Sequence, residues 1–501
     1  MNRREFIKRI SAGAAFLSFP YRIKKSRAQS GNSSDLAHVF VSKNGTVEQN
    51  VEKVLNMMGG IESFVSPDDI VILKPNCQWY NQGTTNITAM KKLIEMILDI
   101  PGFNGEVIVA ENHQKSTPYS RGWTKNNVIN GDPEANNMGQ LIELFRTRGY
   151  SNVTKYHWLN TENGGKVVAG PWDGDGYVRT DPVYEFDGRK TLMTYPVFTS
   201  SFSGITIDLK NGAWKNGKFI DRKVKLINTS VLNHHFFGVT SSIKNIMGIV
   251  ELPGNDTGML VDNEYYNFHG IIYEDEDHID VRAMGGALGT FLREIRKPDL
   301  NIVTAEWVGW GSRIDPEEAV QAHTILGGLD PVALDYFGSK NVLLPHTPEN
   351  YIKYDYHNPD REDRPFNQYL SECAKESGLI MDQAKIQAHV FDYTQSGVQG
   401  HTYKTGSYRV SIGQNYPNPF YSNTTIPFNI KNDSYVSLIV YNIRGREIKR
   451  LIDNKAVLKG DNIAYWDGKD GNGREVPFGM YFCRIISGEE NYTIRILKSR
   501  K

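Results

Sequence analysis

The stretch VKLINTSVLNHHFFGVTSSIKNIMGIVELPGN, residues 224–255, predicts how the centre of this chain folds. It opens with VKLIN, an apolar run of strand length, and Asn233, His234 and His235 follow where that strand should end. Residues 240–242, Thr-Ser-Ser, form an N-cap cluster ahead of helix-spaced apolar residues. The pattern therefore predicts a strand that leads directly into a helix.

The predicted helix carries Lys244 and Asn245 in its first turn. Early N–H groups of a helix that face the end of a strand form a common anion site. We therefore interpret this stretch as the chain's candidate for chemistry, with His235 as general acid or base and Lys244 holding negative charge. The structural alternative is that these Ser and Thr residues only cap a helix and that the lysine is a solvated surface charge.

Two further predicted strands, 70–73 and 106–110, also end in polar residues. These residues are Lys74, Asn76, Glu111, Asn112 and His113. Helical patterns follow the two strands at 87–100 and 138–150. Because ligands of open α/β sheets bind outside the carboxyl ends of the strands, we expect one cleft shared with residues 224–255. The predicted substrate-binding residues are Lys74, Asn76, Asn245, Glu111 and, as a weaker candidate, Asp335.

A metal site is a variant of this hypothesis, with His113, His234, His235 and Glu111 as possible ligands. Adjacent residues of an extended chain point to opposite faces, so only one of the two neighbouring histidines would enter the site. The cofactor stays unassigned.

The three cysteines, Cys77, Cys373 and Cys483, are widely spaced and form no C-x-x-C pair. An iron–sulfur cluster built from this chain is therefore not expected, and buried free thiols are the simpler interpretation. Lys plus Arg equals Asp plus Glu at 57 each, so no net field favours nucleic acid. At 501 residues, the chain is long enough for two or three folded units.

The remaining core pattern predicts a mostly parallel α/β sheet with an antiparallel β insertion at about 155–225, where hairpin signals gather. Further strands are expected at 300–305 and 323–329. Asp330 and Pro331 then suit the N-cap and first position of a helix. Terminal helices are expected at 368–375 and 382–388.

The first thirty residues have the pattern of a targeting segment, which is not part of the folded protein. Arg3 and Arg4, with the following Phe6 and Lys8, resemble the twin-arginine export signal. The apolar run at 10–19 is too short to span a bilayer, and no stable transmembrane segment is expected. The resemblance implies a signal peptide at 1–30 and the twin-arginine translocase as a partner.

The motif VLNHHFFGVTSSIKNIMGI resembles the signature of the uncharacterised domain family 362 (DUF362). His235, Lys244, Asn245 and Gly248 match its pattern, whereas Asn233 stands where the family has a first lysine. The Lys-Pro-Asn that follows strand 70–73 and the Asp-Pro-Val-Ala-x-Asp that ends at Asp335 resemble the same family. Many relatives carry an added ferredoxin-like cysteine cluster, which this chain lacks. The resemblance covers about 69–344, and we assign residues 36–392 to this domain.

A polar, Gly- and Ser-rich linker is expected at 393–407, and the chain changes character after it. Short alternating strands and Asp-Gly or Asn-Gly turns between 408 and 501 predict a β-sandwich. NYPNPF, VYNIRG, WDG and GMYF occur in that order and closely resemble the type IX secretion C-terminal sorting domain, an immunoglobulin-like sandwich.

These features imply an exported protein at the cell surface or outside the cell, which uses the type IX secretion machinery. Two function classes fit the core. It is an enzyme acting on a small anionic or polar substrate, or a non-catalytic surface protein that binds such a ligand or a metal.

Overall fold

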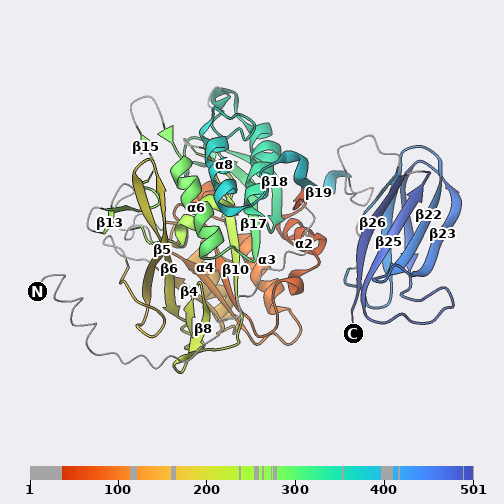
Figure 1. The fold of residues 1–501 in the computed structure, drawn as a ribbon, viewed down its shortest axis with the longest axis horizontal. Coiled ribbons are helices and arrows are strands. Elements are labelled where there is room, and N and C mark those ends of the chain that lie inside the picture. The colour runs from red at the N-terminus through yellow and green to blue at the C-terminus, as the bar shows by residue number, and fades with distance from the viewer. Residues whose placement is uncertain are drawn as a thin grey trace, which may run out of the picture. The chain divides into compact units, whose positions relative to one another are not determined.

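The structure, a computed structural model, shows a mixed α/β core followed by an all-β unit (Figure 1). It describes residues 36–112, 121–158, 165–235, 238–252, 259–261, 264–271, 273–274, 279–352, 355–395, 410–413, 415, 418–488 and 490–499. The predicted twin-arginine segment, residues 1–30, lies outside these described residues.

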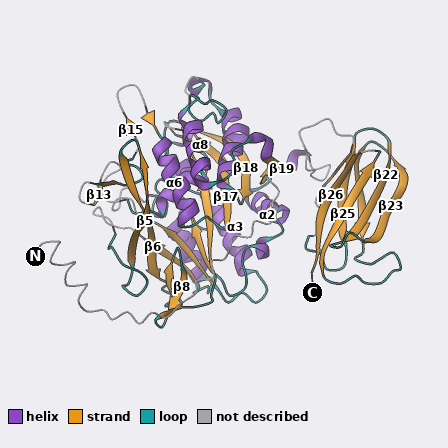
Figure 2. Ribbon diagram, in the orientation of Figure 1, coloured by secondary structure: helices purple, strands orange, loops and turns teal. Residues whose placement is uncertain are grey.

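An eight-stranded sheet forms the centre of the core (Figure 2). Its spatial order is β19 (Ile386–Asp392), β1 (Ala37–Lys43), β18 (Ala319–Gly328), β17 (Leu300–Gly309), β10 (Val224–Val231), β2 (Ile70–Lys74), β3 (Glu106–Glu111) and β4 (Val153–His157). All neighbours from β17 to β4 are parallel, as are β1 and β19, and only β18 runs antiparallel to its neighbours. The predicted mostly parallel sheet is confirmed.

Apolar clusters cover both faces of this sheet. Ile70 and Ile72 of β2 pack into one cluster, whereas Val71 and Leu73 pack into the other. Helices α2 (Val47–Met57), α3 (Ile87–Leu98) and α4 (Met138–Thr147) cover the second face. On the first face lie α5 (Ser242–Asn245), α6 (Arg282–Glu294), α7 (Pro331–Gly338) and α8 (Pro365–Ser377). Strands buried on both faces require continuous apolar runs, which explains why β2, β3, β10 and β17 could be predicted from the sequence.

Several helices begin where the sequence indicates. Asn86 caps α3, and Asp330 caps α7 with Pro331 at its first position, so these predicted starts are confirmed. The helix predicted at 382–388 is wrong. A short 3₁₀ turn, Gln383–Lys385, leads there into β19, whose pairing with β1 outweighs local helical preference.

The predicted antiparallel insertion is confirmed. Its strands are β5 (Gly176–Phe186), β6 (Arg189–Thr199), β7 (Thr206–Asp208), β8 (Gly212–Lys215) and β9 (Lys218–Phe219), joined by β13 (Met259–Val261) and β14 (Tyr265–Tyr266). Two small ribbons pair β11 (Asn233–His235) with β12 (Gly238–Thr240), and β15 (Tyr273–Glu274) with β16 (Ile279–Asp280).

The C-terminal unit is the predicted immunoglobulin-like sandwich. One sheet contains β20 (Val410–Ile412), β21 (Thr424–Ile430) and β24 (Gly460–Trp466), and the other contains β23 (Glu447–Val457), β22 (Ser434–Asn442), β25 (Gly479–Ser487) and β26 (Glu490–Lys498). Both sheets contribute to one apolar core around the fully buried Trp466. Within the described part of the chain, no helix has the length and apolar character needed to cross a membrane.

Candidate active site

A small polar cavity lies where β2, β3 and the segment after β10 end. Its volume is about 30 Å³. The polar side chains that line it are those of Asn76, Gln78, Glu111, Asn112, Lys244 and Asn245. A cavity needs roughly 10–15 Å³ of such volume to hold one water molecule, so this cavity has room for about two water-sized groups. It can admit the polar end of a ligand.

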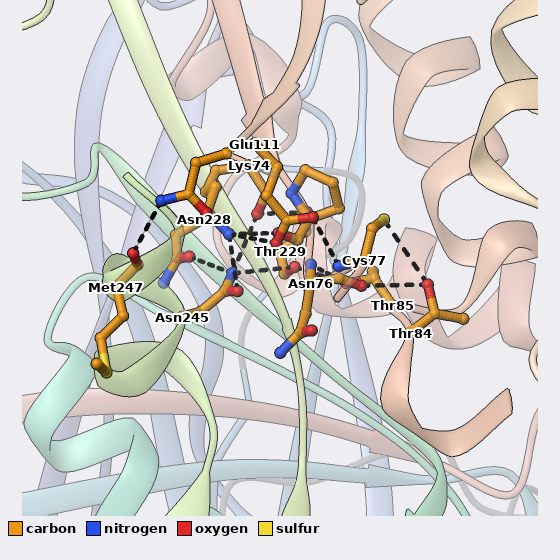
Figure 3. Close-up of polar contacts among 12 residues, drawn as sticks. Lys74, Asn76, Cys77, Thr84, Thr85, Glu111, Asn228, Thr229, Asn245 and Met247 are labelled. Atoms are coloured by element: carbon orange, nitrogen blue, oxygen red, sulfur yellow. Dashed lines mark hydrogen bonds and ion pairs between the residues drawn. The ribbon is translucent and has the colours of Figure 1, made fainter. Parts of the chain in front are cut away.

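Lys74 forms the base of this site at the end of β2. Its side chain is fully buried, and its Nζ donates to Glu111 Oε1 at 3.1 Å, to Asn245 Oδ1 at 2.9 Å and to the Pro75 carbonyl oxygen (Figure 3). An ammonium has three N–H donors, and each one has a partner here. Lys74 therefore fixes the positions of two residues that line the cavity.

Glu111 connects the end of β3 to the same network. Its Oε1 accepts from Lys74, and its Oε2 accepts from the Cys77 backbone N–H at 2.9 Å. Burial raises the pKa of Glu111 and lowers the pKa of Lys74, whereas their mutual attraction opposes both shifts. The pair thus places a carboxyl group with a perturbed affinity for a proton at the wall of the cavity, with the Lys74 ammonium enclosed behind it.

Asn245 is held by a second asparagine that lies inside β10. Its Nδ2 donates to Asn228 Oδ1 at 2.8 Å and to the Lys74 carbonyl at 3.2 Å. Asn228 in turn donates to the Ser242 carbonyl at 2.9 Å and to Asn301 Oδ1 at 3.0 Å. Sequence reasoning missed this role of Asn228, although an asparagine inside an apolar strand run was a visible signal.

Two threonines fix the chain that follows β2. Thr85 Oγ1 donates to the Thr229 carbonyl at 2.8 Å and accepts from the Asn76 N–H at 2.8 Å. Thr84 Oγ1 donates to the Asn76 carbonyl at 3.1 Å. These bonds anchor the backbone of Asn76 (Figure 3), which lines the cavity.

Gly248 brings the backbone close to the Lys74 ammonium. A Cβ at this position would lie 2.5 Å from Lys74 Nζ and 3.2 Å from Glu111 Oε1. Asn112 secures the same turn, since its Nδ2 donates to the carbonyls of Met247 at 3.2 Å and Val250 at 2.9 Å. The glycine of the predicted motif is therefore required by close packing against the ion pair.

The helix of the motif differs from the prediction. α5 has a single turn, and a 3₁₀ turn, Ile246–Gly248, continues it. Asp335 accepts from the N–H groups of Ser242 and Ile243, at 2.9 Å each, so its carboxylate already occupies the amide end of α5. The expectation that this amide end faces the cleft is therefore wrong. Burial raises the pKa of the Asp335 carboxyl to about 6.

The remaining predicted residues fall in different places. Lys244 lines the cavity, whereas the buried His235 is not among the described lining residues and contacts Arg313 Nη2 through its Nε2. Burial, followed by the charges of Lys244 and Arg313, holds the pKa of His235 well below its ordinary value. His234 stacks on Trp310 at 5.2 Å between ring centroids, so the two adjacent histidines do have different surroundings.

Asn233 has a structural role just after the end of β10. Asn233 Oδ1 accepts from the Gly309 N–H, and its Nδ2 donates to the Gln82 carbonyl at 2.6 Å. His113, a candidate metal ligand, lies outside the described residues. Among the residues described, no group of three or more His, Cys, Asp or Glu side chains could hold a metal ion.

Comparisons with known proteins agree with both halves of this architecture. Residues 199–340 match the family described as Domain of unknown function (DUF362), and residues 414–499 match the Secretion system C-terminal sorting domain. The chain carries a DUF362 segment and a type IX secretion sorting domain. The DUF362 segment contains Lys244, Asn245 and Gly248. The sorting domain indicates export to the cell surface or the exterior.

Solved structures give only partial matches. FlgD from P. aeruginosa is 25% identical over 15% of this chain and 58% of its own, with a TM-score of 0.13. PorU and PorZ from Porphyromonas gingivalis are each 17% identical over 20% of this chain, with TM-scores of 0.17 and 0.15. The chain spans 10% of that PorU chain and 13% of that PorZ chain. No curated protein matches.

Proposed function

We propose that the exported DUF362 core is an enzyme that acts on a small anionic or polar substrate, whose charged end enters the cavity beside Lys244. The observation that supports this most is the buried Lys74–Glu111 pair, whose carboxylate lines the cavity. Buried groups whose pKa values move in opposite directions are concentrated at catalytic sites.

The charges of the site favour an anionic group. Lys74 compensates the negative charge of Glu111, and Lys244 adds a positive charge to the described wall. Amide groups of Asn76, Asn112 and Asn245 complete that wall. A carboxylate or phosphate oxygen in the cavity would gain a charge-assisted hydrogen bond from Lys244.

Glu111 is the group placed best for proton transfer. It lines the cavity, whereas His235 does not, and burial brings its pKa closer to the working pH. We therefore assign the acid–base role to Glu111, paired with Lys74, and give His235 a supporting position behind Lys244.

Anion binding by the full chain tests the assignment. Lys244→Ala should weaken binding of inorganic phosphate or acetate in calorimetric titrations by about 10-fold or more, the scale of one charge-assisted hydrogen bond. Lys125→Ala removes the same charge from an exposed position and should leave binding unchanged. Equal affinity in the wild type and Lys244→Ala would contradict the site. If a ligand bound by the protein is recovered chemically unchanged, and Glu111→Gln changes only the affinity for it, the core is a binding protein and not an enzyme.

The entry route is also a proposal: we infer that residues 1–30 direct the chain to the twin-arginine translocase. Arg3→Lys combined with Arg4→Lys should retain the protein in the cytoplasm, as measured by cell fractionation. Deletion of residues 408–501 should instead leave it in the periplasm. Surface display that survives this deletion would count against the use of the sorting domain.

A further inference from the structure

A second and larger cavity lies at another place along the central sheet. Its volume is about 570 Å³, within the range of small-molecule sites. Its polar lining comes from Asn44, Thr46, Gln49, Glu306, His323 and Thr394. These residues belong to the β1–α2 connection and the first turn of α2, the β17–β18 pair and the segment after β19, and none of them lines the first cavity.

A β-bulge places two of these side chains together. Ala305 pairs with Thr324 and Trp307 pairs with Gln321. Glu306 on β17 is therefore opposite two residues of β18, Ala322 and His323, where a regular ladder would place one. His323 lies in this bulge at φ +44°, the left-handed region that non-glycine residues rarely adopt. Bulges and such backbone conformations occur preferentially beside functional sites, where they re-aim a side chain.

The unusual conformation of His323 is held in place from the other side. Its carbonyl accepts from the Asn44 N–H at 2.9 Å and from Asn50 Nδ2 at 3.2 Å. Asn50 is fully buried and is itself bonded to Ser42 Oγ at 2.9 Å. The surrounding structure therefore fixes the backbone from which the imidazole projects.

The bulge creates a carboxylate–imidazole pair with one oxygen left over. Glu306 Oε1 lies 2.8 Å from His323 Nδ1 and accepts from Gln321 Nε2 at 2.9 Å. Glu306 Oε2 is buried and has no hydrogen-bond partner among the described residues, while the side chain as a whole is 10% exposed. A buried carboxylate oxygen without a donor is costly and requires a partner from elsewhere.

Several other polar groups of the cavity already have partners. Thr46 and Gln49 form the capping box of α2, so this helix end does not call for an anion. Asn44 Nδ2 and Thr394 Oγ1 both donate to Asp392, at 2.8 and 2.7 Å, and Lys43 balances that carboxylate at 3.2 Å. Glu306 lines the cavity, and its buried Oε2 lacks a hydrogen-bond donor among the described residues; a positively charged donor suits it best.

We propose that Glu306 and His323 form a second ligand site, which binds the ammonium or guanidinium group of a small organic cation. The cation donates to Glu306 Oε2, and His323 holds the carboxylate through Oε1. A metal ion fits less well, because the residues described provide no third ligand of the usual kind.

Titration of the full chain with n-butylammonium and ethylguanidinium chloride tests this site, with tetramethylammonium as a cation that cannot donate a hydrogen bond. Binding of the two donors should be measurable by calorimetry and at least 10-fold weaker in Glu306→Gln. Glu317→Gln removes an equal charge from the exposed turn between β17 and β18 and should leave the binding of both donors unchanged. His323→Asn, which tolerates a positive φ, should weaken binding while the protein stays folded.

Several results would overturn the proposal. They are no binding of either donor to the wild type, equal binding of tetramethylammonium, or unchanged binding in Glu306→Gln. If Zn²⁺ strongly stabilised the wild-type protein against unfolding and this effect disappeared in His323→Asn, the site would bind a metal ion instead of an organic cation. None of these outcomes depends on the first cavity, and Lys244→Ala should leave the binding of these cations intact.

Discussion

Gly248 lets the Lys74 ammonium lie directly against the backbone of the DUF362 motif. A methyl group there would come within 2.5 Å of Nζ and 2.6 Å of Cε, and Lys74 cannot move because its donors are all engaged. Gly248→Ala should therefore lower the free energy of unfolding by about 1–3 kcal/mol, the usual cost of overpacking a buried site. Urea-induced unfolding would measure this change.

Gly338 provides the matched control for that substitution. A Cβ at Gly338 would meet its nearest atom at 3.6 Å, and the residue lies in α7, where alanine is the better helix former. Gly338→Ala should leave the free energy of unfolding unchanged or slightly raised. If Gly248→Ala and Gly338→Ala lowered the free energy of unfolding equally, the contact with Lys74 would not be the cause of the destabilisation.

Asp335 makes stability depend on pH in an unusual direction. Burial raises its pKa to about 6 from 3.8. The folded protein therefore binds this proton more tightly than the unfolded chain, and the corresponding stability is present below about pH 4 and lost as the pH rises through about 6. The expected loss is on the order of 2–3 kcal/mol.

Asp335→Asn removes this titration. Free energies of unfolding measured across about pH 4 to 7 should decline less steeply in the variant than in the wild type. The slope is the informative quantity, because the amide also loses one acceptor for α5. An unchanged slope would show that Asp335 is not the titrating group.

At the scale of elements, the β insertion holds the end of the motif. Arg179 of β5 forms two 2.7 Å hydrogen bonds with the fully buried Glu251, and Tyr177 donates to the Ile249 carbonyl at 3.0 Å. Thr194 of β6 accepts from the Glu251 N–H at 2.8 Å. The insertion therefore positions the turn that contains Gly248.

A double-mutant cycle measures the strength of this clamp. Arg179→Met leaves the Glu251 charge buried and should cost about 3–5 kcal/mol, whereas Arg179→Met with Glu251→Met should recover much of that loss. Arg146→Met, which removes an exposed i,i+3 partner of Glu143, should change stability by less than about 1 kcal/mol. Additive effects at the first pair would contradict a coupled clamp.

The same scale shows what sequence can reveal. The buried parallel strands β2, β3, β10 and β17 were predicted because their apolar runs are continuous, α3 because of its helical apolar spacing, and α7 because its cap is local. β19 was mistaken for a helix because its strand character comes from pairing with β1, which comes from the start of the core sequence. The position of Asp335 against α5 likewise depends on a contact across the fold that no local pattern encodes.

At the scale of the whole molecule, we expect two independently stable units. Limited proteolysis should cut within 393–407 and leave a resistant core and a resistant sandwich, because exposed linkers are the preferred sites of cleavage. Mass spectrometry of the fragments would locate the cut. A chain that resists cleavage there, or loses both units together, would contradict the boundary.

The candidate site was only partly predictable for a related reason. Strand ends identified Lys74, Asn76 and Glu111, because parallel strands bring their carboxyl ends to one edge. Sequence could not show that Lys74 would be enclosed beneath the cavity, or that His235 would turn toward Arg313. Those positions depend on side-chain packing between segments far apart in the chain.

The central sheet also sets the time at which this protein can fold. β1 lies between β18 and β19, and Ala37 pairs with Ile386, so the first strand of the core has both neighbours only after nearly the whole core has been synthesised. Contacts between residues so far apart in the sequence form slowly. Until β1 has paired with both neighbours, its unpaired backbone groups can form hydrogen bonds with other chains. A ribosome-bound chain that stops before residue 386 should therefore depend on chaperones.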